Sequence, residues 1–211
     1  MRLKLPKTIS SLLTKQELIV FKKLNTPRKI QDFLDKISIN FEPGGDTCLS
    51  PRRVLIEQRA HCIEGAMLAA TALWAHGHRP LLLDLRAADR DYDHVLALFQ
   101  RKDLWGAISK TNHAVLRYRE PVYKNIRELA MSFFHEYFDD YGRKNLRYYS
   151  RPFDLSKLGV GWIVAKDNLW HIAEALDDSP HFPVLNRATL SALRRADKVE
   201  IEAGKIVEWK K

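Results

Sequence analysis

Cys62 and His94 are the two side chains in this sequence best suited to nucleophilic chemistry. A thiol attacks a carbonyl carbon as the thiolate, and a free thiol has a pKa of about 8.5, so activation requires a helix amino terminus, a nearby histidine, or both. Cys62 heads an alanine-rich run that predicts a buried helix, whose first-turn amides and dipole would stabilise a thiolate. His94 opens a predicted strand and is the best candidate for the base.

An imidazole base also needs a group that bonds its second nitrogen. If the hairpin after His94 turns at residues 101–103, antiparallel pairing brings positions 109–110 opposite the neighbourhood of the histidine. The chain supplies Ser109 there, and Asn112 a little further on. A serine accepts a hydrogen bond from imidazole but carries no charge, whereas the amide of Asn112 would reach the ring only if the strand bulges. Both residues are therefore candidates for the orienting group.

Each of these residues also has an ordinary structural interpretation. Burial as an inert thiol is the commonest fate of a cysteine such as Cys62, and His94 would then be a hydrogen-bonded residue at a strand end. Ser109 and Asn112 would be a strand residue and a turn residue. Cys48 lies among turn residues with no histidine nearby in the sequence, and we expect it to be unreactive.

Metal-binding and phosphate-binding patterns are incomplete in this chain. His135-Glu136 has Asp139 where the zinc-protease pattern needs a second histidine. His76-x-His78 has no third ligand at a recognisable spacing, and the dispersed glycines form no phosphate-binding loop. These patterns predict no metal site.

Hydrophobic periodicity, caps and turn residues predict the elements that must position these side chains. A capping box at residues 14–17 and the pairs Thr26-Pro27 and Ser50-Pro51 each predict a helix start. The predicted helices are 15–24, 27–37, 52–60, 62–76, 121–138, 169–176 and 189–195. The predicted strands are 80–85, 94–99, 104–108 and 112–119, with a terminal β-hairpin over 198–209. Helices packed on an antiparallel sheet make an α+β fold.

The composition is that of an ordinary globular protein, with 211 residues of which 45% are hydrophobic and 29% charged, and we predict one domain over residues 1–211. No apolar run approaches roughly 18 residues and the start lacks a signal-peptide pattern, so we predict a cytoplasmic protein without a membrane span. Two cysteines in a chain of this size predict reduced thiols. The net charge of +9 favours an anionic partner such as nucleic acid, although the basic residues are scattered.

The order of these segments resembles the core of the transglutaminase-like superfamily, which is related in architecture to papain-like cysteine proteases. The resemblance rests on RAHCIEGAMLAATALWAHGHRPLLLDL, DHVLALF and LWGAIS and covers roughly residues 26–120, with 121–211 as a C-terminal extension. It implies that Cys62 is the nucleophile, that His94 is the base, and that an aspartate on the following strand orients the base. The aspartate position falls on Ser109, which departs from the family pattern.

The resemblance implies a cysteine enzyme that acts on an amide or peptide bond through a thioester, with no metal or organic cofactor. Its substrate would be a peptide or protein amide, and hydrolysis is favoured over acyl transfer. The alternative, motivated by Ser109, is a fold that has lost catalysis and serves as a binding module for a protein or a nucleic acid. The rate at which Cys62 reacts with a thiol reagent distinguishes the two hypotheses.

Overall fold

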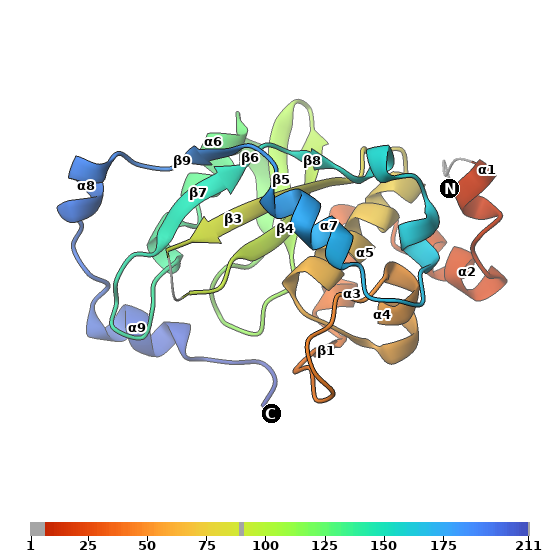
Figure 1. Ribbon diagram of the computed structural model, residues 1–211, viewed down its shortest axis with the longest axis horizontal. Coiled ribbons are helices and arrows are strands. Elements are labelled where there is room, and N and C mark those ends of the chain that lie inside the picture. Colours follow the sequence, from red (N-terminus) through yellow and green to blue (C-terminus); the bar gives the residue numbers. More distant parts are fainter. Residues whose placement is uncertain (1–6, 89–90, 211) are drawn as a thin grey trace.

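The computed structural model describes residues 7–88 and 91–210. Its centre is a seven-stranded sheet in the order β6-β5-β4-β3-β7-β9, with β8 paired to β3, and each of these pairings is antiparallel (Figure 1). The strands are β3 Leu81–Ala87, β4 His94–Arg101, β5 Leu104–Ser109, β6 Arg119–Tyr123, β7 Leu146–Ser150, β8 Phe153–Asp154 and β9 His181–Pro183. A short parallel pair of strands, β1 Ser38–Ile39 and β2 Arg59–Ala60, lies outside this sheet. The fold is α+β, as predicted.

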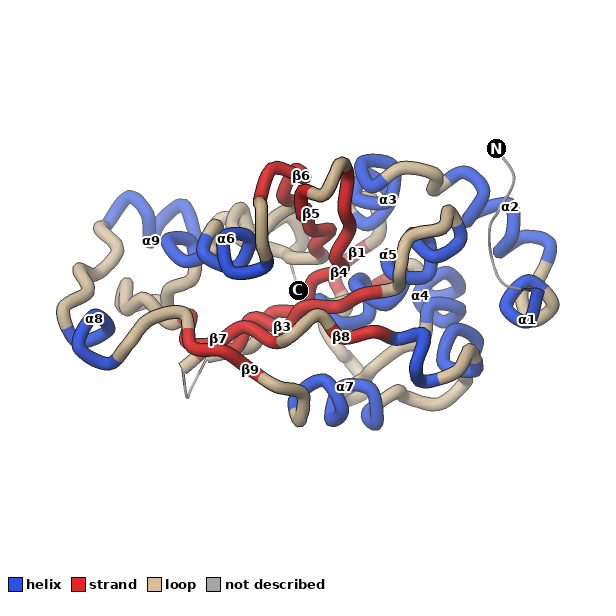
Figure 2. Tube along the Cα trace, turned by 90° about the horizontal axis from the view of Figure 1, so that it is seen from above, coloured by secondary structure: helices blue, strands red, loops and turns tan. Residues whose placement is uncertain are grey.

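The helices of the amino-terminal part of the chain gather at one end of the molecule, and the later helices lie toward the other end except α7, Trp170–Asp177, which lies between the two (Figures 1 and 2). The amino-terminal group is α1 Lys7–Ser10, α2 Lys15–Lys23, α3 Pro27–Leu34, α4 Pro51–Glu57 and α5 Cys62–Ala75. The later helices are α6 Ile126–Met131, α7 Trp170–Asp177, α8 Arg187–Ser191 and α9 Lys198–Gly204, with 3-10 turns at Phe134–Glu136, Leu155–Leu158 and Gly161–Val164. The predicted caps are confirmed, because Thr14, Thr26 and Ser50 each accept a hydrogen bond from a first-turn amide. In the described part of the chain, no helix is long and apolar enough to cross a membrane.

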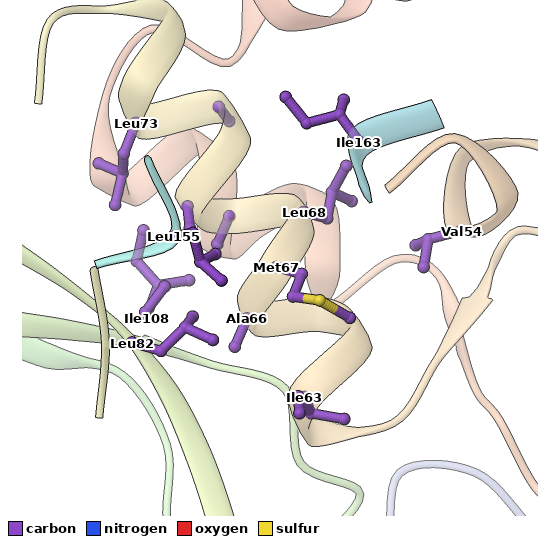
Figure 3. Packing of buried hydrophobic residues seen from close by; sticks show 14 of the residues in the cluster. Val54, Ile63, Ala66, Met67, Leu68, Leu73, Leu82, Ile108, Leu155 and Ile163 are labelled. Carbon is purple, nitrogen blue, oxygen red and sulfur yellow. The ribbon is translucent and has the colours of Figure 1, made fainter. Parts of the chain in front are cut away.

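Helix α5 is buried on nearly all sides because small side chains let its neighbours approach. Its alanines from Ala66 to Ala75 are fully buried. Figure 3 shows the buried side chains packed around it, which include Val54, Leu82, Ile108, Leu155 and Ile163. A Cβ atom at Gly65 would lie 2.5 Å from the Cβ of Lys110, so only glycine permits this close approach of the chain after β5.

The hairpin between β4 and β5 turns where the sequence predicts. Lys102 and Asp103 have φ angles of 50° and 63°, the left-handed values that a two-residue type I′ turn requires. The resulting register pairs Leu96 with Ser109. Ser109 therefore lies diagonally across from His94, two residues along the neighbouring strand.

The predicted helix over 121–138 is wrong, and so is the predicted strand over 112–119. Residues Arg119–Tyr123 form the edge strand β6, where the missing N–H of Pro121 is tolerated because no strand of the described residues pairs with the outer side of β6. The helix begins only after Asn125, whose side chain accepts a hydrogen bond from the amide of Glu128. This cap competes with the apolar periodicity, and it ends the strand and starts α6.

The predicted terminal hairpin is also wrong, because residues Lys198–Gly204 form α9. Asp197 accepts hydrogen bonds from the first-turn amides, and the side chain of Glu200 accepts one from the Asp197 amide. This capping box stabilises a helix start despite the strand-like alternation of Val199 and Ile201. Val199 is 74% exposed, so the alternation corresponds to no buried face.

Candidate active site

Cys62 is the first residue of α5, and it is partly exposed at the wall of a cleft of about 750 Å³. Burial by itself would raise the pKa of the Cys62 thiol. Hydrogen bonds from His61 and His94, together with their positive charge, outweigh burial and lower the pKa from 9.0 to about 5. The structure thus brings His94 to Cys62, as the sequence predicts, and the surroundings favour a thiolate.

The hydrogen bonds of His94 define which of its nitrogens carries a proton. The Nε2 atom lies 2.8 Å from Oγ of Ser109, and this hydroxyl donates its own proton to the carbonyl oxygen of Leu116 at 2.6 Å. Because a serine has one proton, Nε2 of His94 must be the donor and Ser109 the acceptor. The Nδ1 atom of His94 is then left to exchange a proton with the thiol. His94 and Ser109 are both buried, which protects this arrangement from water.

Gln31 of α3 holds Ser109 in place. Its side-chain amide accepts a hydrogen bond from the backbone N–H of Ser109 at 2.9 Å and donates one to the Ser109 carbonyl at 2.8 Å. The next residue, Lys110, is 1% exposed and donates to the carbonyl oxygens of Leu34, the last residue of α3, and Ile37, which follows the helix. Hydrogen bonds of the Ser109 backbone and of the Lys110 side chain therefore fix the end of β5 against α3 and the residues that follow it.

A second histidine, His61, lies on the other side of the thiol. Its Nε2 is 2.9 Å from the carbonyl oxygen of Thr47 and 3.3 Å from Oε1 of Glu64. Burial would lower the pKa of His61, but the hydrogen bond and charge of Cys62, followed by the charge of Glu64, raise it to about 9. His61 is thus a cation at neutral pH and pairs with the thiolate.

Glu64 is a fully buried carboxylate that organises the start of α5. Its oxygens accept hydrogen bonds at 2.7 to 3.0 Å from the backbone amides of Leu49 and His61 and from the side chains of Thr47 and Asn40. A carboxylate with this many donors is held in one orientation. Glu64 therefore contacts both the backbone N–H and the ring of His61, and it caps the amino terminus of the helix that begins with Cys62.

Asn112, the alternative candidate for orienting His94, bonds the C-terminal segment instead. Its side-chain amide donates to the carbonyl of Trp209 at 3.0 Å and accepts from the Trp209 amide at 2.8 Å. Asn112 therefore holds the C-terminal segment, and it is Ser109 that accepts the hydrogen bond from His94. Cys48 is fully buried, and burial first, then the charge of Glu64, raises the pKa of its thiol to about 12. This is consistent with the expectation that Cys48 is unreactive.

The cleft next to Cys62 is formed by segments far apart in the sequence. Its walls include Ile39 of β1, Tyr92 in the loop before β4, and Ile201 of α9. An isolated antiparallel bridge joins His113 to Val207, so the chain after α9 closes one side of the cleft. The C-terminal extension thus contributes directly to the shape of the site.

Sequence reasoning missed His61, Glu64 and Gln31. The spacing His61-x-x-Glu64 at a helix start does match that of a capping box, so a local signal for this pair was present. Nothing local marks Gln31, because its partner Ser109 is 78 residues away.

The helix-borne cysteine is followed by a strand that begins with a histidine, and then by an antiparallel strand that ends with the residue bonded to that histidine. This is the order and contact pattern that the family resemblance implies. The charged aspartate of the family pattern is replaced by the neutral Ser109.

The chain matches no family model and no curated protein. Among solved structures it is similar to LapG of Legionella pneumophila. The calcium-bound form of LapG is 20% identical over 48% of this chain and 58% of LapG, with a TM-score of 0.33, so the alignment spans just over half of that protein. The EGTA-treated form is 17% identical, with 72% of this chain and 79% of LapG covered and a TM-score of 0.38. A further LapG structure is 16% identical with the same coverage and a TM-score of 0.39.

Proposed function

We propose that the protein is a cysteine enzyme that cleaves or transfers an acyl group from a peptide or protein amide. The observation that supports this most is the low pKa of Cys62, about 5, at a helix start that faces a cleft. A buried structural thiol would have a raised pKa, as Cys48 does in the same molecule. Two thiols in one chain with opposite pKa shifts argue that the surroundings of Cys62 serve reactivity.

In the first half of the reaction, the Cys62 sulfur is already a thiolate whose proton is held on Nδ1 of His94, and it attacks the carbonyl carbon of the substrate. The carbonyl oxygen becomes an oxyanion, and the backbone N–H of Cys62 at the helix start donates a hydrogen bond to it. Nδ1 of His94 then gives its proton to the amine nitrogen, and the carbon–nitrogen bond breaks. The products are a free amine and a Cys62 thioester.

In the second half, a water molecule gives a proton to Nδ1 of His94 as its oxygen attacks the thioester carbon. The carbon–sulfur bond breaks, the acid leaves, and the Cys62 sulfur departs as thiolate. An amine in place of water gives acyl transfer by the same steps. Ser109 accepts from Nε2–H throughout and keeps the ring aligned, while His61 supplies the positive charge beside the sulfur.

The test is incubation with a library of peptides, followed by mass spectrometry of the products. We expect wild-type protein to yield cleaved or amine-transferred peptides, and we expect Cys62→Ser and His94→Ala to yield none. Cys48→Ser is the matched control and should leave the products unchanged, because that thiol is buried away from the cleft. Products that persist in Cys62→Ser would contradict the proposal. A complete lack of products, together with an unreactive Cys62, would favour the binding-module alternative.

A further inference from the structure

The carbonyl oxygen of Leu116 decides how Ser109 meets His94. The Ser109 hydroxyl donates its single proton to this carbonyl at 2.6 Å, so the serine oxygen accepts from Nε2 of His94. Without that carbonyl, the hydroxyl would be free to turn and donate to Nε2. A neutral His94 would then carry its proton on Nδ1, the nitrogen that has to accept a proton from the thiol or from water.

Leu116 presents this carbonyl from an unfavourable backbone conformation. Its φ angle is 59°, in the left-handed region where the Cβ of a leucine lies close to the following carbonyl oxygen. Such a conformation persists only where the surroundings impose it, and it is concentrated at functional sites. The backbone N–H of Leu116 donates to Oε2 of Glu136 at 2.8 Å. Leu116 is therefore held by Glu136 through its N–H and by Ser109 through its carbonyl.

Glu136, which ends the 3-10 turn Phe134–Glu136, is itself fixed by an anchored arginine. Its Oε1 atom lies 2.7 Å from Nη2 of Arg119, which leaves Oε2 for Leu116. The Arg119 guanidinium donates to the side chain and the carbonyl of Ser132 at 3.1 and 3.2 Å, and it lies 4.1 Å from the centre of the Phe133 ring. The Arg119 side chain is only 14% exposed, so this ion pair holds the carboxylate in one place.

We propose that Glu136 is a positioning residue for the reaction of Cys62. By holding the N–H of Leu116, it keeps the Leu116 carbonyl aimed at Ser109, and through Ser109 it sets which nitrogen of His94 carries the proton. This inference rests on the function proposed above. In the described part of the chain, Glu136 has no hydrogen bond to either reacting side chain, so its effect passes through Leu116 and Ser109.

The first experiment observes the proton on His94 directly. Nitrogen NMR of histidine-labelled, full-length Cys62→Ala protein at about pH 9 shows which nitrogen of a neutral imidazole is protonated, and a His94→Ala sample assigns the signal. We expect Nε2–H, and a shift of the population toward Nδ1–H when Glu136→Ala is added. Glu120→Ala is the matched control, because it removes an exposed carboxylate next to Arg119 on β6 and should leave the tautomer unchanged.

The second experiment measures the reaction of Cys62 with a dithiodipyridine disulfide at about pH 5.5. A serine that donates to Nε2 of His94 favours neutral imidazole, so it opposes the ion pair with the thiolate. Glu136→Ala should therefore slow the reaction by up to about tenfold, the limit set by one neutral hydrogen bond. In the Ser109→Ala background the same change should alter the rate by less than about twofold, because the path through Ser109 is already broken.

A second variant covers the case in which Glu136→Ala does not fold, which circular dichroism detects. Glu136→Asp keeps a negative charge beside Arg119 but shortens the side chain by one methylene, so the carboxylate cannot reach both Arg119 and Leu116. We expect it to give the same shift of the His94 proton and the same dependence on Ser109.

The inference is overturned if loss of the Glu136 contact leaves the His94 tautomer unchanged. It is also overturned if that loss slows the Ser109→Ala variant as much as the wild type, because a merely structural role would act equally in both backgrounds. An unreactive Cys62 in the wild type would count against the proposed function alone. The tautomer measurement does not need the thiol, and it would then decide the inference by itself.

Discussion

The reactivity of Cys62 as a function of pH is the sharpest test of the site. The pKa of Cys62 is about 5, against 9.0 for an ordinary thiol. At pH 5.5 about three-quarters of Cys62 is then thiolate, which is about 2,000 times the fraction in an ordinary thiol. Each thiolate is less nucleophilic, however, because a Brønsted slope of about 0.4–0.5 over four pKa units costs about 40- to 100-fold. Cys62 is therefore expected to react about 20- to 60-fold faster than an ordinary thiol at pH 5.5.

The rate advantage of Cys62 over an ordinary thiol should disappear at higher pH. At about pH 7.5 an ordinary thiol is about 3% ionised, so the thiolate advantage of Cys62 is only about 30-fold and its lower nucleophilicity cancels it. The assay is stopped-flow reaction with a dithiodipyridine disulfide, which absorbs when it is cleaved, from about pH 4 to about pH 9. N-acetylcysteine is the reference thiol. Cys48→Ser should give the same trace, since Cys48 is fully buried with a pKa of about 12.

Variants of the two histidines identify the cause of the shift. His61→Ala and His94→Ala should each move the inflection of the rate profile to higher pH, because each removes a hydrogen bond and a positive charge from the thiolate. A wild-type profile that rises only near pH 9, as for a free thiol, would refute the electrostatic reasoning. A low inflection that neither variant moves would show that the helix start alone lowers the pKa.

Three further outcomes follow from the structure. Ser109→Ala should slow the reaction at pH 5.5 by up to about tenfold because it removes an acceptor worth about 0.5–1.5 kcal/mol, whereas Asn112→Ala should leave the rate unchanged. Gly65→Ala should lower the free energy of unfolding by about 1–3 kcal/mol in urea denaturation, because its Cβ would overlap Lys110; a neutral effect would contradict the close packing. Glu64→Ala should destabilise the fold by about 3 kcal/mol or more, measured in the same way, because several buried donors lose their acceptor; a loss under about 1 kcal/mol would contradict this.

Prediction from the sequence succeeded where the determinants are local. Caps at Thr14, Thr26 and Ser50 and the turn at Lys102 act over a few residues, and the helices and hairpin they predict are present. It failed where two local signals conflict. At residues 121–138 and 198–209 an apolar pattern suggested one element, and a cap inside the pattern stabilised another.

The sequence by itself determined that Cys62 begins a buried helix and that β4 and β5 pair so that Ser109 comes near His94. Only the tertiary structure decided which side chains of the site are charged. His61 is charged because its hydrogen bond and charge contact with Cys62, followed by the charge of Glu64 and the hydrogen bond to the backbone of Thr47, outweigh the opposite effect of burial on its pKa. These contacts arise only once β1, the loop before α4 and the start of α5 are packed together. Electrostatic interactions depend on the distance between the charges and on the exclusion of water, and both are set only when the chain has folded.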